Sequence, residues 1–203
     1  MFVLPPPSDF LVRIVTDHER LAVHGLATTR LVLYGFLAGA VPGLVLGYLT
    51  ARFRFCALFL YPLVVFVQGL PKITLAPLML VWFGYSDFPK VLLTGLITFF
   101  PILVDSMAGF RATDPRLHYI TRSMGADTWQ SFRYVRLPAA MTYVFAGMKI
   151  GIVKAVEGVI IAEFIGSSAG LGFMIMRASS FMDQTLMFAG LIATALVAMV
   201  FNA

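Results

Sequence analysis

Five long apolar stretches, separated by shorter polar segments, dominate the pattern of this chain. They run over residues 31–50, 55–83, 91–110, 139–165 and 186–201. A helix needs about 20 apolar residues to cross the hydrocarbon core of a bilayer, and each stretch approaches or exceeds that length. The pattern therefore predicts an all-α, polytopic membrane protein with about five transmembrane helices.

The second apolar stretch, residues 55–83, leaves two interpretations open. Three prolines interrupt it: Pro62, Pro71 and Pro77. Each proline removes a backbone donor and tends to bend a helix. The stretch is either one curved crossing or two half-helices hinged at residues 69–71, and the second arrangement would reverse the side of every later loop. A bend here is as consistent with a curved structural helix as with a cavity beside Lys72.

Basic residues favour the five-crossing interpretation. Five crossings place Arg52, Arg54 and the five arginines of residues 111–136 on one side. Cytoplasmic loops are enriched in Lys and Arg, so we expect this side to face the cytoplasm. The N-terminal segment, residues 1–25, then lies outside, and residues 26–203 form the transmembrane domain. Two hinged half-helices would separate Arg52 and Arg54 from the later loop.

The first apolar stretch carries a glycine at every fourth position. These glycines are Gly35, Gly39, Gly43 and Gly47. On a helix they line one nearly bare face. A bare face lets a neighbouring helix approach closely, and close packing holds helices together in lipid. We interpret the ladder as a helix-packing face, which bears on assembly and not on activity.

Composition supports a membrane protein and narrows its chemistry. Hydrophobic residues make up 60% of the chain and charged residues only 12%, whereas soluble domains carry about 25% charged residues. The net charge of +5 then reports orientation in the membrane, and we expect no nucleic-acid partner. One cysteine excludes an intramolecular disulfide and a cysteine metal site. The three histidines are scattered, so we assign no metal site.

The polar loop over residues 111–137 is unusually long and patterned for a helix connection. Its Asp114-Pro115 start favours a short helix over residues 115–124, and Gly125 suits a left-handed helix end. Asp127, with Gln130 three residues later, is close to a capping box that begins a second short helix. Such a helix–glycine turn–helix would display the aromatic and arginine side chains typical of interface hot spots. The alternative is an amphipathic hairpin that lies on anionic membrane lipid.

Residues 122–140 resemble the cytoplasmic "EAA" loop of permease subunits of bacterial ABC importers. In that pattern a glycine is followed by nine residues, an aliphatic residue, one more residue and Leu-Pro, as Gly125 and residues 135–138 are here. Other segments are similar to the nitrate, sulfonate and taurine branch of the family, which includes riboflavin and thiamine-precursor importers. These segments are residues 4–9, 70–71, 76–78, 82–84, 99–102, 162–164 and 170–172.

The chain departs from the family pattern in two places. Tyr119, Ile120 and Thr121 stand where the family has Glu-Ala-Ala. Such permeases usually have six crossings and a basic tail, so we expect the type I importer permease fold without its usual first helix. The glycine and the Leu-Pro pair keep the rest of the loop pattern.

The resemblance implies the transmembrane subunit of an ATP-driven importer in the bacterial plasma (inner) membrane. It would move a small solute, such as a sulfonate, taurine, nitrate or a vitamin precursor, from an extracytoplasmic solute-binding protein to the cytoplasm. The resemblance also implies a homodimer. No Gly-x-x-x-x-Gly-Lys-Ser/Thr loop occurs in the chain, so we expect a separate ATPase subunit to bind ATP. This chain is expected to be no enzyme and to bind no cofactor.

The same resemblance places residues 116–132 in the cleft of the ATPase as a coupling helix. The ATPase-coupling candidates are Arg116, Ile120, Thr121, Arg122, Met124, Gly125, Ala126, Asp127, Trp129 and Phe132. Closure of the ATPase on ATP would pull on this helix and rock the crossings as a rigid body.

Charged residues within the apolar stretches form a second set, because charges at membrane depth are costly and commonly functional. The candidates for a translocation path or gate are Lys72, Lys149, Lys154, Glu157 and Glu163. Lys154 and Glu157 are three residues apart, a spacing at which they can simply neutralise each other. Glu163 is a candidate for an external gate or a binding-protein contact, or it caps a loop in water.

A secondary transporter driven by an ion gradient is the main alternative. Such proteins are commonly built from internal repeats with paired broken helices, and no repeat is evident in the sequence. A membrane anchor for an enzyme complex is a further alternative, and it would need paired histidines or cysteines.

Overall fold

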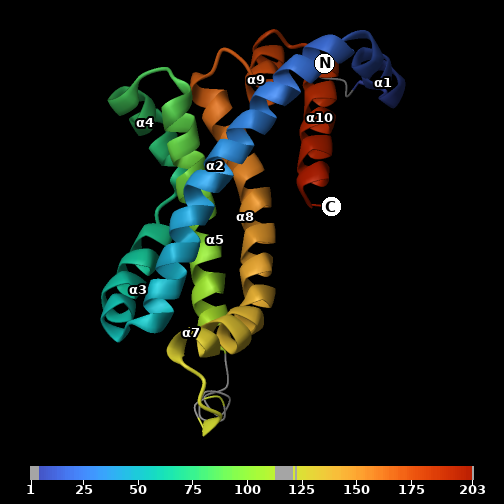
Figure 1. Ribbon diagram of the computed structural model, residues 1–203. Helices are drawn as coiled ribbons and strands as arrows, with labels where there is room; N and C mark the ends of the chain where they lie inside the picture. The colour runs from blue at the N-terminus through green and yellow to red at the C-terminus, as the bar shows by residue number, and fades with distance from the viewer. Residues whose placement is uncertain (1–4, 113–120, 122, 203) are drawn as a thin grey trace.

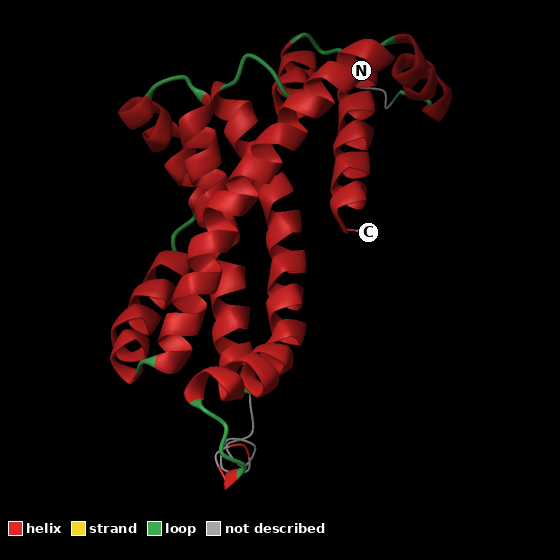
Figure 2. Cartoon of the chain, in the orientation of Figure 1, coloured by secondary structure: helices red, strands yellow, loops and turns green. Residues whose placement is uncertain are grey.

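The computed structural model describes residues 5–112, 121 and 123–202, and its regular elements are all helical (Figure 2). The prediction of an all-α protein is confirmed. In chain order the elements are α1 (Pro7–Thr16), α2 (His18–Arg52), α3 (Arg54–Gln68), the 3-10 helix η1 (Lys72–Thr74), α4 (Leu75–Phe83), α5 (Asp87–Arg111), α7 (Thr128–Ser131), the π-helix η2 (Phe132–Arg136), α8 (Leu137–Gly166), α9 (Leu171–Ser180) and α10 (Gln184–Asn202).

Within the described residues, α2, α5 and α10 are each long and apolar enough to cross a membrane alone. Two bent pairs each add one crossing if the pair is a single span. The first pair, α3 with η1 and α4, is bent by 77°, and the second, α7 to α8 with α9, is bent by 46°. The resulting total of up to five agrees with the apolar pattern of the sequence.

Helices α2 and α5 pack along the glycine ladder. The contacts are Gly35 with Thr94, Gly39 with Gly95 and Thr98, Gly43 with Phe99 and Ile102, and Gly47 with Ser106. The partners advance in the same direction along both helices, so α2 and α5 run parallel. A Cβ atom added at Gly47 would lie 2.6 Å from the Cβ of Ser106. The two helices therefore leave no room for side chains on this face of α2.

Helix α8 packs against the same two helices and completes the central bundle (Figure 1). Its glycines meet α5 in the opposite order, with Gly147 against Asp105, Gly151 against Ile102 and Gly158 against Thr94. Hence α8 runs antiparallel to α5. Between α2 and α8 a buried apolar cluster fills the interface: Leu31, Val32, Ile152, Ala155, Val156 and Val159.

The parallel pairing of α2 and α5 decides how the chain connects them. Because both helices run from the upper to the lower end in Figure 1, the chain between them returns across the bundle once. Helix α3 lies beside the lower end of α2, and α4 lies near the upper start of α5 (Figure 1). The break at residues 69–71 is present, but the interpretation that it reverses every later loop is wrong.

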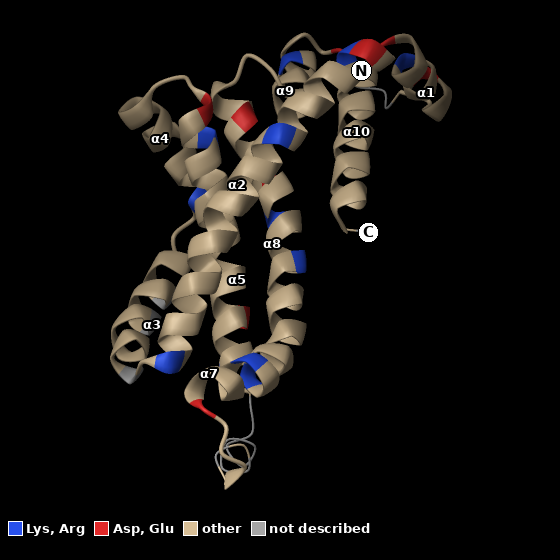
Figure 3. Cartoon of the chain, in the orientation of Figure 1, with Lys and Arg blue, Asp and Glu red and all other residues tan. Residues whose placement is uncertain are grey.

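The described basic residues at the α2–α3 junction and within residues 111–136 therefore lie at the same end of the bundle. The Arg111 guanidinium donates a hydrogen bond to the carbonyl of Thr50 across 3.2 Å. Figure 3 shows Lys and Arg positions at this lower end, near the end of α2 and around α7. At the upper end, α1 packs on α10 through stacked Phe10 and Phe188 rings, 5.9 Å apart. Since α2 begins at His18, residues 1–25 include α1 and the first turns of α2.

Gly39 offers a direct test of the close α2–α5 contact. A Cβ at this position would collide with the backbone oxygen of Gly95, so we expect Gly39→Ala to lower the free energy of unfolding by roughly 1–3 kcal/mol, as overpacking does. Gly25→Ala, in the same helix but with nothing within 4 Å of the added Cβ, is the matched control. Thermal unfolding in detergent measures both, and equal stability of the two variants would contradict this packing.

Candidate functional site

A glycine turn leads into α7 at the lower end of the bundle. Gly125 has φ of 81°, and the Ala126 N–H donates to the Thr121 carbonyl across 3.0 Å. This hydrogen bond and the positive φ form the left-handed helix end that the sequence predicts. A Cβ at Gly125 would meet nothing within 4 Å, so the backbone conformation, and not space, requires glycine. The expected helix over residues 115–124 falls mostly outside the described residues.

Asp127 begins the helix that follows, through a complete capping box. Its carboxylate accepts the Gln130 N–H at 2.6 Å, and the Gln130 side-chain oxygen accepts the Asp127 N–H at 3.0 Å. The capping box of the sequence analysis is therefore confirmed. The two hydrogen bonds pair backbone N–H groups that a helix start leaves without partners.

The helix that starts here is not a separate short helix, as the sequence suggested. Helices α7, η2 and α8 follow one another without a loop. The π-helical turn brings the Leu137 N–H to the Phe132 carbonyl, and Pro138 comes directly after it. Proline has no N–H and clashes with the carbonyl four residues earlier in an α-helix. The wider π-turn relieves that clash and lets the chain continue into α8.

Aromatic rings attach α7 and η2 to the bundle. The Phe132 ring lies 5.1 Å from Tyr48 of α2, 6.4 Å from Phe110 of α5 and 5.7 Å from Trp129 of α7, measured between ring centroids. Phe132 is partly buried, whereas Trp129 is 64% exposed and Met124 is 80% exposed. Among these three coupling candidates, Phe132 attaches the segment to the bundle, whereas Trp129 and Met124 are exposed apolar side chains.

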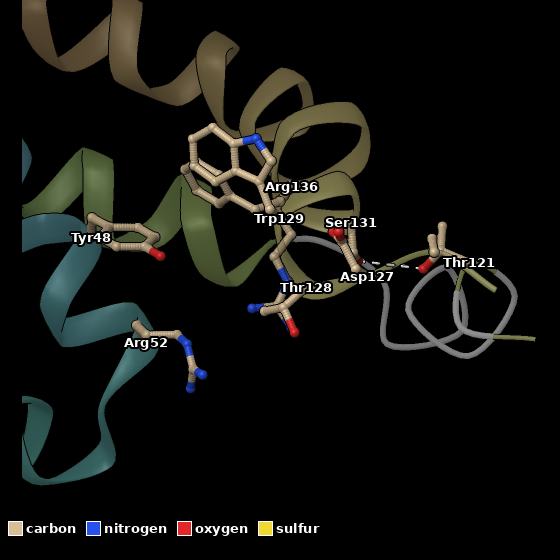
Figure 4. Close-up of a pocket in the computed structure, with 10 residues that line it drawn as sticks. Tyr48, Arg52, Thr121, Asp127, Thr128, Trp129, Ser131 and Arg136 are labelled. Atoms are coloured by element: carbon tan, nitrogen blue, oxygen red, sulfur yellow. Dashed lines mark hydrogen bonds between the residues drawn. The ribbon is translucent and has the colours of Figure 1, made fainter.

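A pocket of about 470 Å³ opens between this segment and α2 (Figure 4). Its lining residues are Tyr48, Arg52, Thr121, Ala126, Asp127, Thr128, Trp129, Ser131, Phe132 and Arg136. Figure 4 shows Tyr48 and Arg52 entering from α2, with Trp129 and Asp127 on the other side. The Thr121 and Ser131 hydroxyl oxygens lie 3.4 Å apart. Five coupling candidates therefore line one pocket, while Arg116, Ile120 and Arg122 lie outside the described residues.

Sequence reasoning missed Tyr48 and treated Arg52 only as a marker of orientation. Both reach this pocket because α2 ends beside the start of α8. No local motif marks Tyr48, since its role depends on a ring of Phe132 that lies far along the chain. The result is a mixed apolar and basic surface suited to contact with another protein. In the part of the chain that the structure describes, no three His, Cys, Asp or Glu residues gather closely enough to hold a metal ion.

The charged candidates in the crossings do not form one site. The Lys154 ammonium donates to Glu157 at 2.7 Å, which is the pairing that their spacing allowed. Lys149 lies five residues before Lys154 on the same helix, and its side chain is exposed. Lys72 lies at the break between α3 and α4, where its ammonium is 3.4 Å from the Gln68 carbonyl and 5.5 Å from the centroid of the Phe100 ring.

Glu163 lies at the upper end and is only 1% exposed. Its carboxylate accepts the Thr28 hydroxyl at 2.9 Å and the Gly172 N–H at 2.8 Å. The interpretation that Glu163 caps a loop in water is therefore wrong, because the α8–α9 turn covers the carboxylate. Sequence reasoning also missed Lys90, which is 7% exposed and bonds Asp87 and Ser167 nearby.

Comparison with known proteins decides the family. The sequence pattern of the family described as "Binding-protein-dependent transport system inner membrane component" matches residues 43–203. The chain belongs to this family of permeases. The permease also shares its fold with a solved amino acid ABC transporter with histidines, at a TM-score of 0.72 and 18% identity, over 94% of this chain and 91% of that chain.

Individual relatives place the permease in the nitrate, sulfonate and taurine branch. It is 33% identical to the aliphatic sulfonates transport permease protein SsuC of Bacillus subtilis, over 96% of this chain and 71% of the relative. It is 34% identical to the riboflavin transport system permease protein RibX of Chloroflexus aurantiacus, over 97% and 74%. It is 27% identical to the taurine transport system permease protein TauC of Escherichia coli, over 96% and 74%.

The permease is thus the transmembrane subunit of an ATP-driven ABC importer and a multi-pass protein of the inner membrane. A permease of this family works with an ATPase and with a solute-binding protein. Nothing in the comparisons supports the alternative of a secondary transporter.

Removal of the Asp127 cap tests the local structure of this site. Asp127→Ala deletes the acceptor for the Gln130 N–H and should cost ~1 kcal/mol of local stability, or roughly fivefold in hydrogen-exchange protection of that amide. Asp127→Asn keeps a capping oxygen and should retain most of the protection. Equal protection in the alanine variant and the unmodified permease would rule out the capping box.

Proposed function

We propose that Thr121 and residues 123–132 form the surface that docks on the ATPase subunit. The observation that carries this proposal is the exposure of Met124 and Trp129 at a basic end of the bundle. Large apolar side chains that stand in water mark protein contact sites when polar groups surround them. Here Arg52, Asp127 and Arg136 line the pocket beside Trp129. An exposed tryptophan next to arginines has the chemistry of an interface hot spot.

The position of this surface supports a cytoplasmic lower end. Arg52, Arg111, Arg133 and Arg136 belong to the segments at the lower end of the bundle (Figure 3). An excess of basic residues in short loops favours the cytoplasmic side. In this orientation the docking surface faces the compartment of the ATPase, and the N-terminus, α9 and the start of α5 lie outside.

The fold offers a direct mechanical path from this surface into the membrane. Movement of α7 passes along the unbroken η2 and α8 and through the Phe132 ring contacts to α2 and α5. Because α8 packs along both helices, the three helices would rock as one body between inward and outward openings. The aromatic anchor would therefore transmit the force, and the exposed Trp129 would receive it.

We further propose that two copies of the permease form the transmembrane unit. Lys149, Lys154 and Glu157 are exposed on α8 in a single chain. Charged side chains at membrane depth face protein or a water-filled path and not lipid. A second copy that covers this face of α8 would place the charges against protein and beside a water-filled path that the two copies share.

The solute that we favour is a small anionic sulfonate. SsuC and TauC are named for aliphatic sulfonates and taurine. Lys154 is neutralised by Glu157, whereas no ion pair in the described residues involves Lys149. An unpaired ammonium beside the path would attract an anion that passes it. A vitamin such as the riboflavin named for RibX is the second candidate, and it would gain less from this charge.

The docking surface can be tested by co-purification with the ATPase. Trp129→Asp places a charge where the partner should bury an apolar ring, and we expect the ATPase to be lost from detergent pull-downs. Tyr85→Asp changes an 85% exposed aromatic residue in the turn between α4 and α5, and it should leave co-purification intact. Retention of the ATPase by a correctly inserted Trp129→Asp permease would refute the docking role.

Transport itself tests the energy source and the proposed path. In vesicles that contain the permease, its ATPase and its binding protein, a hydrolysis-blocking ATPase mutation should abolish uptake of an alkanesulfonate anion. Lys149→Gln should lower uptake severalfold, and Lys149→Arg should retain most of it, because only the charge is needed. Uptake of riboflavin but not of the alkanesulfonate would reject the sulfonate proposal, and uptake without hydrolysis would reject the importer mechanism.

A further inference from the structure

The start of α9 is bound by side chains from two other helices. Three successive backbone N–H groups each donate to a different side chain. The Gly170 N–H donates to Nδ1 of His24 at 3.0 Å, the Leu171 N–H to Oγ1 of Thr28 at 2.8 Å, and the Gly172 N–H to Oε2 of Glu163 at 2.8 Å. A helix start leaves such donors without intrahelical partners. Here α2 and α8 supply the acceptors, so capping also fixes where α9 lies.

Thr28 and Glu163 close this arrangement into a buried network. The Thr28 hydroxyl accepts from Leu171 and donates to Oε1 of Glu163 at 2.9 Å. Both side chains are almost fully buried. A buried carboxylate is costly unless hydrogen bonds satisfy it, and the positive end of the α9 dipole adds to its stabilisation. Removal of either side chain therefore leaves buried polar groups without partners.

The glycines of the α8–α9 turn make room for this carboxylate. A Cβ added at Gly170 would overlap the Glu163 carboxylate, and one added at Gly172 would lie 2.8 Å from Cβ of Glu163. Gly170 also has φ of 111°, which disfavours any other residue. The turn is thus shaped around the buried Glu163 side chain.

Helix α5 holds the same turn from a third direction. The Lys90 ammonium donates to the Ser167 hydroxyl at 3.1 Å, and that hydroxyl donates to the Ala169 carbonyl at 2.6 Å. Asp87 holds Lys90 at 3.0 Å and Arg30 of α2 at 3.2 Å. We define the α9 latch as His24, Thr28, Lys90 and Glu163. The latch joins the α8–α9 turn to all three helices of the central bundle.

We infer that the α9 latch makes α9 move as a rigid part of the α2–α5–α8 bundle, and that Glu163 is a positioning residue that touches no solute. The chain bends by 46° between α8 and α9, and without the latch residues 167–170 would act as a hinge. Because the three bundle helices share the latch, their rocking would carry α9 with them and open or close the outer mouth. This role rests on the proposed orientation and rigid-body mechanism.

The mechanical part of the inference can be tested by hydrogen exchange on the full permease–ATPase complex in nanodiscs. Thr28→Val keeps the side-chain shape but removes the hydroxyl, and Glu163→Ala removes the carboxylate. Both should lower the protection of amides 170–180 at least tenfold, while amides in α5 stay protected. Thr28→Ser should restore protection. Thr98→Val is the matched control, because the buried Thr98 hydroxyl donates to the Thr94 carbonyl of its own helix and, among the described residues, to no other helix.

Coupling is measured on the same variants by uptake and ATP hydrolysis in vesicles. Thr28→Val and Glu163→Ala should raise the ATP hydrolysed per solute severalfold and leave the KM for solute unchanged, since neither side chain contacts it. A raised KM in Glu163→Gln with normal protection of α9 would show a solute contact and overturn the inference. Unchanged protection in both latch variants, or lost protection with normal coupling, would also overturn it. The exchange measurement stands even if the importer mechanism itself fails.

Discussion

Close contact between three helices without intervening side chains is the constraint on which this structure depends. The glycines of α2 lie against α5, and the glycines of α8 lie against the same stretch of α5 in the reverse order. In lipid, where apolar burial gives helices little reason to associate, such backbone proximity supplies the packing energy. The register of these contacts makes α2 and α5 parallel and α8 antiparallel. That register, more than any loop, decides which residues meet at each end of the bundle.

Local signals in the sequence predicted the parts that depend on neighbouring residues. The glycine ladder spans about three turns of one helix, and Gly125 with the Asp127 capping box spans six residues, so propensity and spacing are sufficient. The break at residues 69–71 was also visible from its prolines. The basic residues favoured one crossing for this segment, and the parallel pairing of α2 with α5 agrees with that prediction.

Long-range contacts explain what the sequence could not predict. Glu163 meets Thr28, which is 135 residues away, and nothing near Thr28 marks it as the acceptor for the start of α9. The sequence therefore left an external gate, a binding-protein contact and a water-exposed cap open for Glu163, whereas the fold buries its side chain. The π-helical turn was missed for a related reason. Pro138 predicts a helix start, yet α7, η2 and α8 follow one another without a loop, and Phe132 of η2 contacts Tyr48 and Phe110.

The two ends of the bundle differ in the groups that they bury and expose. At the upper end, polar groups are buried, and their hydrogen bonds are made within the chain. At the lower end, the side chains of Met124 and Trp129 remain mostly exposed. A buried and satisfied network gains nothing from a partner, because its donors and acceptors are already used. Exposed apolar side chains gain the most from a partner protein, since the partner removes them from water. The same three helices therefore carry a surface suited to contact with a partner at one end and the α9 latch at the other. A rigid-body motion that passes from one end to the other requires this arrangement.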